Sequence, residues 1–441
     1  MNRSRSSKSR PPGILLAAAL GLAATLAGAG AQAEGLAELF DGQLPNNFPF
    51  LNNAGTAATF STAGFVDLTN PFHSPQGSNG RSCESCHLPQ VGWSIRPVDI
   101  ELKFLLTRGE DPIFNPLDAN SPTPDVSSLQ AKRASYSMLR KGLFRRGGTI
   151  PAAGEFEIAE LDDPLGAGGK LPTTVQTYRR PLATANFHIA QNIGWHDQNT
   201  DGTATVPVGL FRQADGNIIG AQGGPQAPKA IVDSIVSYEL GLAFAQQFSF
   251  SAGLLTACGA KGGPENLSAQ LTAKGRFDLF DAWKDLRPGS CGSKAADRKR
   301  AQIARGQQVF NGEVEGVTGN CSGCHNAVNN GSNVDGRLFD IHASQVQNRK
   351  PGMPLFKMRN KTTGETHQTT DPGRALRTGR WADMDRFKVP SLRGVIARAP
   401  YFHNGIAANL DQVVRHYEVE LGFAFEDPAD REALIAFMEA L

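Results

Sequence analysis

Beyond its first thirty residues, the 441-residue chain has no long apolar run, no internal repeat outside one short motif and no excess of basic residues. A bilayer crossing needs about twenty consecutive apolar residues, so we expect no membrane span after residue 33. The first 33 residues carry four basic and no acidic residues, and without them the formal charge changes from +2 to −2. This balance argues against a nucleic-acid partner. Cysteine is also scarce, with six residues in all.

The first 33 residues have the pattern of a secretion signal. Basic residues precede an apolar run over residues 14–30, which is rich in Ala and Leu. Ala31-Gln32-Ala33 then gives the small-x-small pattern of a cleavage site. We therefore expect a signal peptide over residues 1–33 and a periplasmic mature protein, with an uncleaved membrane anchor as the alternative.

Four of the six cysteines lie in two Cys-x-x-Cys-His pentapeptides. This spacing places two thiols one helical turn apart, where both can form thioether bonds to one porphyrin, and the histidine that follows supplies an axial nitrogen to the iron. A zinc knuckle and a redox dithiol are the alternatives. Two complete copies among so few cysteines favour two covalent haem c groups. The residues concerned are Cys83, Cys86 and His87 in the first motif and Cys321, Cys324 and His325 in the second.

Composition divides the rest of the chain into three parts. Pro, Gly and Asp are abundant and periodicity is weak over about 99–175, so we expect a large insertion of loops there. Cys258 and Cys291 remain after the haem cysteines are assigned, and in an oxidising compartment they are free to pair. The expected parts are an N-terminal haem c domain over 34–248, a linker over 249–296 and a C-terminal cytochrome c domain over 297–441.

Helical spacing is clearest near the second motif. Residues 297–310 are expected to form a helix in which Gly306 lets another helix approach closely. The C-terminal segment is its natural partner, with Asp427 as N-cap and Pro428 as the first helical residue. Residues 230–247 are expected to form a further helix. Crossed first and last helices around a haem are the cytochrome c plan. We therefore expect a mainly α fold of two cytochrome c-type haem domains with long loop insertions.

Three strings resemble the bacterial dihaem cytochrome c peroxidase and MauG family. They are residues 387–394 (Phe-Lys-Val-Pro-Ser-Leu-Arg-Gly), residues 399–405 (Ala-Pro-Tyr-Phe-His-Asn-Gly) and residues 180–186 (Arg-Pro-Leu-Ala-Thr-Ala-Asn), the last followed by Trp195. The resemblance implies two cytochrome c domains and hydrogen peroxide as the oxidant. It also implies that one haem is five-coordinate and reacts, while the other is six-coordinate and relays electrons.

The resemblance suggests a sixth ligand for the second haem iron. In the family this ligand lies fourteen residues beyond the histidine of the second string, which leads from His403 to Tyr417, with Leu410 matching the family's leucine on the way. Ordinary peroxidases have methionine there, whereas MauG has tyrosine, which stabilises oxidised iron. The alternative ligands are Met384, Met353, Met358 and His416.

The first haem lacks a residue that the family normally has. Typical peroxidases carry a histidine sixteen residues past the proximal histidine, and it caps this iron. Here that position is Lys103, and no histidine occurs between His87 and His188. We therefore expect the first iron to be open, with His188 and His196 as the alternative ligands.

Two further roles follow from the family. Trp195 matches the tryptophan that carries oxidising equivalents between the haems, although the residues after it depart from the family's Asp-Gly-Arg. The group that breaks the O–O bond of peroxide is harder to place, because residues 213–222 contain no histidine or glutamate. Gln222 and Asp215 are the candidates in that segment.

The family's calcium ligands are also missing. Their positions are occupied by Arg180 and Arg398, and a guanidinium cannot ligate calcium. We expect no calcium there. These two arginines, together with Arg393, are instead candidates to pair with haem propionates.

The resulting hypothesis is an exported dihaem oxidoreductase that uses hydrogen peroxide at an open N-terminal haem to oxidise a partner. That partner is a small electron-donor cytochrome or a protein substrate. The alternatives are a dihaem oxygenase, in which the open haem binds oxygen, and a non-enzymatic electron-transfer cytochrome with two six-coordinate irons.

Overall fold

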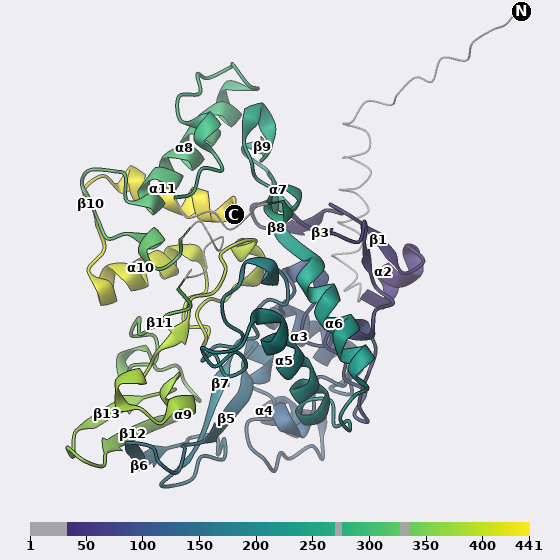
Figure 1. The fold of residues 1–441 in the computed structure, drawn as a ribbon, viewed down its shortest axis with the longest axis vertical. Coiled ribbons are helices and arrows are strands. Elements are labelled where there is room, and N and C mark those ends of the chain that lie inside the picture. Colours follow the sequence, from purple (N-terminus) through teal and green to yellow (C-terminus); the bar gives the residue numbers. More distant parts are fainter. Residues whose placement is uncertain (1–32, 270–275, 327–334) are drawn as a thin grey trace, which may run out of the picture.

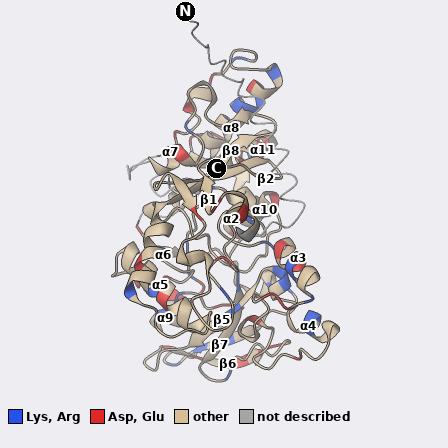
Figure 2. Cartoon of the chain, turned by 90° about the vertical axis from the view of Figure 1, so that its right-hand side faces the viewer, with Lys and Arg blue, Asp and Glu red and all other residues tan. Residues whose placement is uncertain are grey.

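The structure is a computed structural model that describes residues 33–269, 276–326 and 335–441. The expected signal peptide lies outside the described residues, apart from Ala33. No helix in the described ranges is both long enough and apolar enough to cross a membrane. Basic and acidic segments are interspersed on the side of the molecule drawn in Figure 2.

Helices account for 35% of the structure and strands for 18%, so the expectation of a mainly α fold is right only in part. The α-helices in the described ranges are α2 (Ala33–Leu39), α3 (Pro97–Thr107), α4 (Leu129–Ser135), α5 (Val206–Gly220), α6 (Lys229–Gly241), α7 (Pro264–Ser268), α8 (Lys294–Asn311), α9 (Ala375–Thr378), α10 (Leu410–Leu421) and α11 (Pro428–Glu439).

The strands are short and form several small sheets. The largest is a four-stranded sheet in the order β2-β3-β8-β9, followed by a three-stranded sheet in the order β13-β12-β6. The strands are β1 (Gln43–Pro45), β2 (Phe50–Asn52), β3 (Gly55–Ser61), β4 (Phe65–Asp67), β5 (Phe144–Thr149), β6 (Phe156–Asp162), β7 (Thr174–Arg179), β8 (Leu242–Ser249), β9 (Gly253–Leu254), β10 (Val317–Thr318), β11 (Leu338–Phe339), β12 (Leu355–Asn360), β13 (Thr366–Thr369), β14 (Phe387–Lys388) and β15 (Ala424–Phe425).

The crossed helices expected near the second motif are confirmed. α8 contains the expected helix, and α11 begins after Asp427, whose side chain accepts a hydrogen bond from the backbone of the second helical residue. The two helices lie together in Figure 1. Gly306 is the contact point, because a Cβ atom there would lie 1.8 Å from the carbonyl oxygen of Ala433. The apolar stripe of α11 is buried against this contact.

Replacing Gly306 should therefore separate α8 from α11. We expect Gly306→Ala to lower the free energy of unfolding by about 1–3 kcal/mol, because the added methyl group overlaps backbone atoms that cannot move independently. Thermal unfolding followed by circular dichroism measures the change. Gly220→Ala is the matched control, because a Cβ at this helical glycine meets no atom within 4 Å. An equal effect of both changes would contradict the close contact.

The helix expected over residues 230–247 is correct only in its first part. α6 ends at Gly241, and the chain continues as β8, which pairs antiparallel with β3 along its whole length. Residues 242–247 of the expected helix therefore lie in a strand. Spacing alone does not distinguish a short apolar strand from the end of a buried helix. The strand that pairs with β8, and so makes this segment a strand, is β3, which lies far earlier in the chain.

The segment over 99–175, expected to be an insertion of loops, contains α4, β5, β6 and most of α3. β6 pairs antiparallel with β12, which belongs to the expected C-terminal domain. A sheet thus joins backbone from the two expected haem domains. The division of the chain into domains, and the insertion itself, stay predictions.

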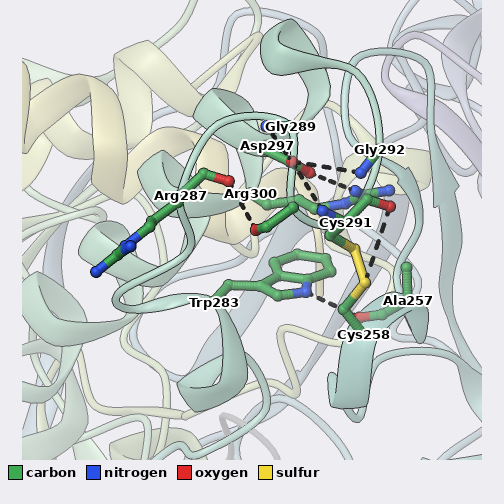
Figure 3. The surroundings of a disulfide bond; sticks show 10 residues. Ala257, Cys258, Trp283, Arg287, Gly289, Cys291, Gly292, Asp297 and Arg300 are labelled. Carbon is green, nitrogen blue, oxygen red and sulfur yellow. Dashed lines mark hydrogen bonds and ion pairs between the residues drawn. A yellow bond between two sulfur atoms is a disulfide. The ribbon is translucent and has the colours of Figure 1, made fainter.

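A disulfide joins Cys258 and Cys291, as the sequence allowed (Figure 3). Beside it, Asp297 accepts hydrogen bonds from three backbone N–H groups of the preceding turn and from the guanidinium of Arg300. Burial alone would raise the pKa of Asp297, but these donors lower it below its usual value. The indole of Trp283 donates to the carbonyl of the residue before Cys258. A cross-link of this kind contributes about 2–4 kcal/mol to stability, and this one fixes the start of α8.

Two hydrophobic clusters occupy the two sides of the molecule. One gathers aromatic residues of the C-terminal part around Phe437, and Cys321 packs at its edge. The other surrounds Phe72 and Trp93 in the N-terminal part, with Cys83 at its edge. Each Cys-x-x-Cys-His motif therefore lies on the surface of a packed core.

Candidate haem sites

Both motifs open on one cavity of about 950 Å³. Its size is at the upper end of the range for small-molecule and cofactor sites. Of the site residues predicted from the sequence, the structure brings together those of both motifs with three others. The lining includes Cys83, Cys86, His87, Cys321, Cys324, His325, Trp195, Gln222 and Tyr417.

The first motif forms a tight turn that presents His87 to the cavity. The backbone N–H of Cys86 donates to the carbonyl of Cys83 (3.2 Å), so the two thiols lie on one turn. Nδ1 of His87 lies 3.0 Å from the backbone carbonyl of Trp93. Because a carbonyl only accepts, Nδ1 carries the proton and Nε2 is unprotonated. Burial lowers the pKa of His87 to about 4, so the imidazole is neutral and suited to bind a metal.

The second motif begins on the 3-10 helix η8 (Cys321–Gly323), and the backbone N–H of His325 donates to the carbonyl of Cys321 (2.8 Å). β10 pairs with β15 just before the motif. The ring of Phe423 lies against Gly319, whose φ of +100° favours glycine. These contacts hold the C-terminal end of α10 beside the second pair of thiols.

The four motif thiols are not joined in disulfides. Burial raises the pKa of Cys86 to about 11 and that of Cys321 to about 12, and it raises the pKa of Cys83 and Cys324 as well. Zinc binding and dithiol redox chemistry both require thiolates. No group of three or more His, Cys, Asp or Glu side chains that could hold a metal ion is found within the described ranges. That each motif binds a covalent haem stays a prediction.

The cavity wall is cationic. Among the described residues, no Asp or Glu lines it, whereas seven arginines and one lysine do. Four of these arginines pair with carboxylates outside the wall. Arg81 (2.8 Å) and Arg146 both pair with Asp118, Arg377 pairs with Asp201 (3.0 Å), and Arg179 pairs with Asp371 through two bonds of 2.6 and 2.7 Å. The cationic side chains are Arg81, Arg146, Arg179, Arg180, Arg212, Arg377, Lys388 and Arg398.

Three of these cations are held by backbone carbonyls only. The guanidinium of Arg180 donates to the carbonyls of Gly142 (3.0 Å) and Ile95 (2.6 Å). Lys388 Nζ and Arg398 Nη2 each donate to one carbonyl, at 2.6 and 2.9 Å. Burial lowers the pKa of both arginines to about 10 and that of Lys388 to about 8. Desolvated cations without carboxylates require an anion nearby.

Haem fits this cavity. Its propionates would supply the missing negative charge, and its apolar ring would contact the aliphatic and aromatic residues of the wall. Neutral thiols and an unprotonated Nε2 on His87 suit thioether formation and iron ligation. The residues present thus match the group that the two motifs predict.

No protein-family model matches the chain. The cytochrome-c peroxidase IdrP2 of Denitromonas iodatirespirans is 30% identical over 153 residues, which are 32% of this chain and 40% of IdrP2. The methylamine utilization protein MauG of Paracoccus denitrificans is 29% identical over 128 residues, which are 27% of this chain and 32% of MauG. A solved MauG-like protein associated with microbial copper homeostasis is 16% identical, with a TM-score of 0.35, over 61% of this chain and 74% of that chain.

The resemblance to the cytochrome c peroxidase and MauG family is confirmed. The chain spans between about a third and two fifths of the length of the two curated relatives.

Tyr417, which the family resemblance suggests as the ligand of the second iron, lies in the cavity wall. It belongs to α10, and burial with the nearby Cys321 and Cys324 raises its pKa. The phenol has no hydrogen-bond partner among the described residues, so its oxygen is available. Nε2 of His416, by contrast, is bonded to the carbonyl of Ile341 (2.7 Å).

The three alternative methionines also lie elsewhere. Met358 is fully buried in a hydrophobic cluster that Met384 packs against, and Met353 belongs to another such cluster. None of the three lines the cavity, whereas Met438 of α11 does. Met438 was not among the ligands that the sequence suggested. Ligation by Tyr417 remains a prediction.

The two histidines suggested as alternative ligands of the first iron each have one hydrogen-bonded ring nitrogen. Lys103, at the position of the family's capping histidine, forms a buried ion pair with Asp111 (2.8 Å), and His188 Nε2 lies 3.3 Å from the carbonyl of Leu267. His196 does line the cavity, but its Nδ1 is hydrogen-bonded to Arg179. Burial and that arginine lower the pKa of His196 to about 3. The geometry is consistent with the open site that the sequence predicted.

Trp195 is fixed in the wall by three contacts. Its indole nitrogen donates to the carbonyl of Arg180 (2.6 Å), its own carbonyl accepts from the backbone of Lys388 (2.8 Å), and its ring lies 6.1 Å from that of His403. His403 in turn stacks on Phe387 at 3.9 Å. These contacts fix the indole within the wall, and its role as a relay stays a prediction.

Gln222 lies beside the first motif. Its amide oxygen accepts from the backbone of Gln76 (2.9 Å), and its nitrogen lies 3.8 Å from the sulfur of Cys83. Asp215 does not line the cavity, whereas Gln213 and Asn217 of the same helix do. These two amides were not predicted from the sequence, because a titratable group was expected there. α5 thus contributes two amide side chains to the cavity wall.

Arg393, a predicted partner of a haem propionate, does not line the cavity. Its guanidinium is buried, and it lies over the ring of Phe277 at 5.8 Å. Arg180 and Arg398, by contrast, do line the cavity. The sequence analysis overlooked Arg179 and Lys388, although Lys388 stands within the string at 387–394. The absence of calcium near Arg180 stays a prediction.

Removing the thiols of one motif should remove one haem. We expect the Cys83→Ser/Cys86→Ser variant, and likewise the Cys321→Ser/Cys324→Ser variant, to hold one haem c instead of two, because each loses both thioether bonds. Pyridine haemochrome spectra and the mass of the denatured chain count the haems.

The matched control is Cys258→Ser/Cys291→Ser, which removes the disulfide and should keep both haems. Stoichiometric zinc in place of haem would contradict the assignment.

Proposed function

We propose that the protein is an exported, periplasmic dihaem c-type oxidoreductase that uses hydrogen peroxide at the N-terminal haem to oxidise a partner. The C-terminal haem relays electrons. The observation that carries this proposal is that both Cys-x-x-Cys-His motifs, Trp195 and Tyr417 line one cavity with a cationic wall. The similarity to cytochrome-c peroxidase IdrP2 and to MauG supports the same reaction class.

The residues near the first motif would hold a haem iron and bind peroxide next to it. A haem iron at His87 supplies an open coordination position at which peroxide can react. Trp93 holds the imidazole of His87 through its carbonyl, which fixes the ligand's orientation and tautomer. Gln213 and Asn217 offer amide groups that can hydrogen-bond a small polar oxidant. The cavity wall offers no carboxylate for proton transfer, so these amides position the ligand and do not act as bases.

The residues near the second motif favour an oxidised centre. A phenolate from Tyr417 is a hard, electron-rich donor that stabilises ferric and higher states, whereas methionine favours ferrous iron. A low-potential second haem connected through Trp195 suits the oxidation of a difficult substrate. This distinguishes the proposed enzyme from an electron-transfer cytochrome with two capped irons. The partner is a small electron-donor cytochrome or a protein substrate.

The resting ferric protein should react with hydrogen peroxide without prior reduction, because Lys103 occupies the position of the family's capping histidine and is held in an ion pair with Asp111. Stopped-flow mixing should show rapid loss of the high-spin Soret absorbance. The control is the Cys83→Ser/Cys86→Ser variant, which should lack this phase. If the oxidised protein is inert and reacts only after adding one electron, the first site is capped and the proposal of an open haem is wrong.

Tyr417→Phe should change the second haem and spare the first. Loss of the phenolate opens or re-ligates that iron, so its low-spin EPR signal should change, while the peroxide phase keeps its rate. Tyr401→Phe is the matched control, because Tyr401 also lines the cavity and is not expected to ligate. An unchanged low-spin signal in Tyr417→Phe would show that another residue, such as Met438, is the ligand.

A further inference from the structure

Four aromatic rings form a compact cluster behind the first motif. The ring of Tyr238 on α6 lies 5.8 Å from Trp93, 5.6 Å from Phe72 and 5.5 Å from His73. Trp93 also contacts Phe72 at 5.8 Å and His73 at 6.2 Å. The cluster is buried and none of its members lines the cavity. It is therefore a separate feature from the wall that contains Trp195.

A hydrogen-bond chain runs from this cluster to the first motif. The hydroxyl of Tyr238 lies 2.8 Å from Nε2 of His73, and Nδ1 of His73 lies 2.8 Å from a carboxylate oxygen of Glu84. A carboxylate only accepts, so Nδ1 carries the proton and Nε2 accepts from the phenol. The network thus assigns the tautomer of His73. Glu84 orients the imidazole as the aspartate does in a Ser-His-Asp triad.

This arrangement distinguishes Tyr238 from the other four tyrosines of the chain. The hydroxyls of Tyr136 and Tyr178 both donate to backbone carbonyls at 2.8 Å, and a carbonyl cannot take up a proton. The hydroxyls of Tyr401 and Tyr417 have no hydrogen-bond partner among the described residues. Within the described ranges, only the phenol of Tyr238 is bonded to a base.

The cluster is also connected to the proposed iron ligand. The carbonyl of Trp93 accepts the hydrogen bond from His87, and its ring contacts Tyr238. The indole nitrogen of Trp93 donates to the hydroxyl of Thr59 (3.0 Å), which is not a base. An electron can therefore pass through Trp93 toward the first site, whereas only Tyr238 can release a proton at the same time.

We infer that Tyr238 is a redox-active residue that donates an electron through Trp93 to the oxidised first haem site while its phenolic proton moves to Nε2 of His73. This inference rests on the proposed function, because the oxidising equivalent comes from hydrogen peroxide. The O–H bond of Tyr238 breaks and an N–H bond on His73 forms. The electron reduces the oxidised site by one equivalent. The products are a neutral tyrosyl radical and an imidazolium that stays hydrogen-bonded to Glu84.

The surrounding charges favour this step. Burial, Glu84, Asp67 and Glu239 raise the pKa of Tyr238 well above its usual value, so the phenol keeps its proton until it is oxidised. The hydrogen bond between Nδ1 of His73 and the carboxylate of Glu84 can be kept when Nε2 takes up the proton. Loss of the electron alone would instead leave a buried cation on the ring, which burial opposes.

The test uses the intact two-haem protein. Ferric protein is mixed with hydrogen peroxide or with hexachloroiridate(IV), a one-electron oxidant, and is then frozen for EPR. We expect an organic radical whose hyperfine pattern narrows in protein made with ring-deuterated tyrosine. The signal should vanish in Tyr238→Phe and persist in the matched control Tyr136→Phe. In His73→Gln the radical should form more slowly, on the order of a hundredfold, because the base is lost.

The outcomes separate this inference from the proposed function. Haem content and the thermal midpoint confirm that each variant is folded. A Soret change with peroxide but no radical dependent on Tyr238 with either oxidant overturns the inference and leaves the proposed function intact. A radical dependent on Tyr238 with hexachloroiridate(IV), but no reaction with peroxide, supports the inference and overturns the proposed function. A tyrosyl radical of equal yield and rate in His73→Gln contradicts the proton transfer.

Discussion

Desolvated positive charge in the cavity wall is the constraint on which the rest of the site depends. Arg180, Lys388 and Arg398 give their hydrogen bonds to backbone carbonyls, and burial lowers the pKa of all three. Removing such a cation from water costs on the order of several kcal/mol unless an opposite charge comes close. The described residues supply no carboxylate on the cavity side. The wall is therefore built for an anionic occupant, and haem propionates meet that need.

The same wall joins the N- and C-terminal parts of the chain. The backbone N–H of Arg180 donates to the carbonyl of His403 (2.6 Å), and that of Lys388 donates to Trp195 (2.8 Å). The indole of Trp195 then bonds back to Arg180. Because Trp195 holds both parts together, its position cannot change without disturbing the cationic wall. The proposed electron relay and the charge that binds the cofactors thus share one set of hydrogen bonds.

Features that depend on a few neighbouring residues could be predicted from the sequence. Features that depend on contacts with distant parts of the chain could not. The motifs, the cap at Asp427 and the close approach at Gly306 depend on residue type and short spacing, and the structure contains each of them. β8 was mistaken for a helix because its partner β3 lies far away in the chain. Arg393 was placed with the cofactors because its string matched the family. Its guanidinium lies over the ring of Phe277, outside the cavity wall, which no local pattern indicates, and its pairing with a propionate stays a prediction.

Trp195 and Tyr238 differ in the hydrogen-bond partners of their polar atoms. They therefore differ in whether they can lose a proton when they are oxidised. The indole N–H of Trp195 meets a carbonyl, so an oxidised Trp195 would keep its proton and its positive charge beside a wall already rich in arginine. Such a state is unfavourable and suits a transient relay. Tyr238 meets the imidazole of His73, backed by a carboxylate, in surroundings that contain Asp67 and Glu239. Under the inference drawn above, oxidation there would leave a neutral radical because the proton has moved to His73, so the oxidising equivalent would be retained. Whether an oxidising equivalent stays on Trp195 or on Tyr238 would therefore depend on which residue can transfer its proton to a neighbouring base.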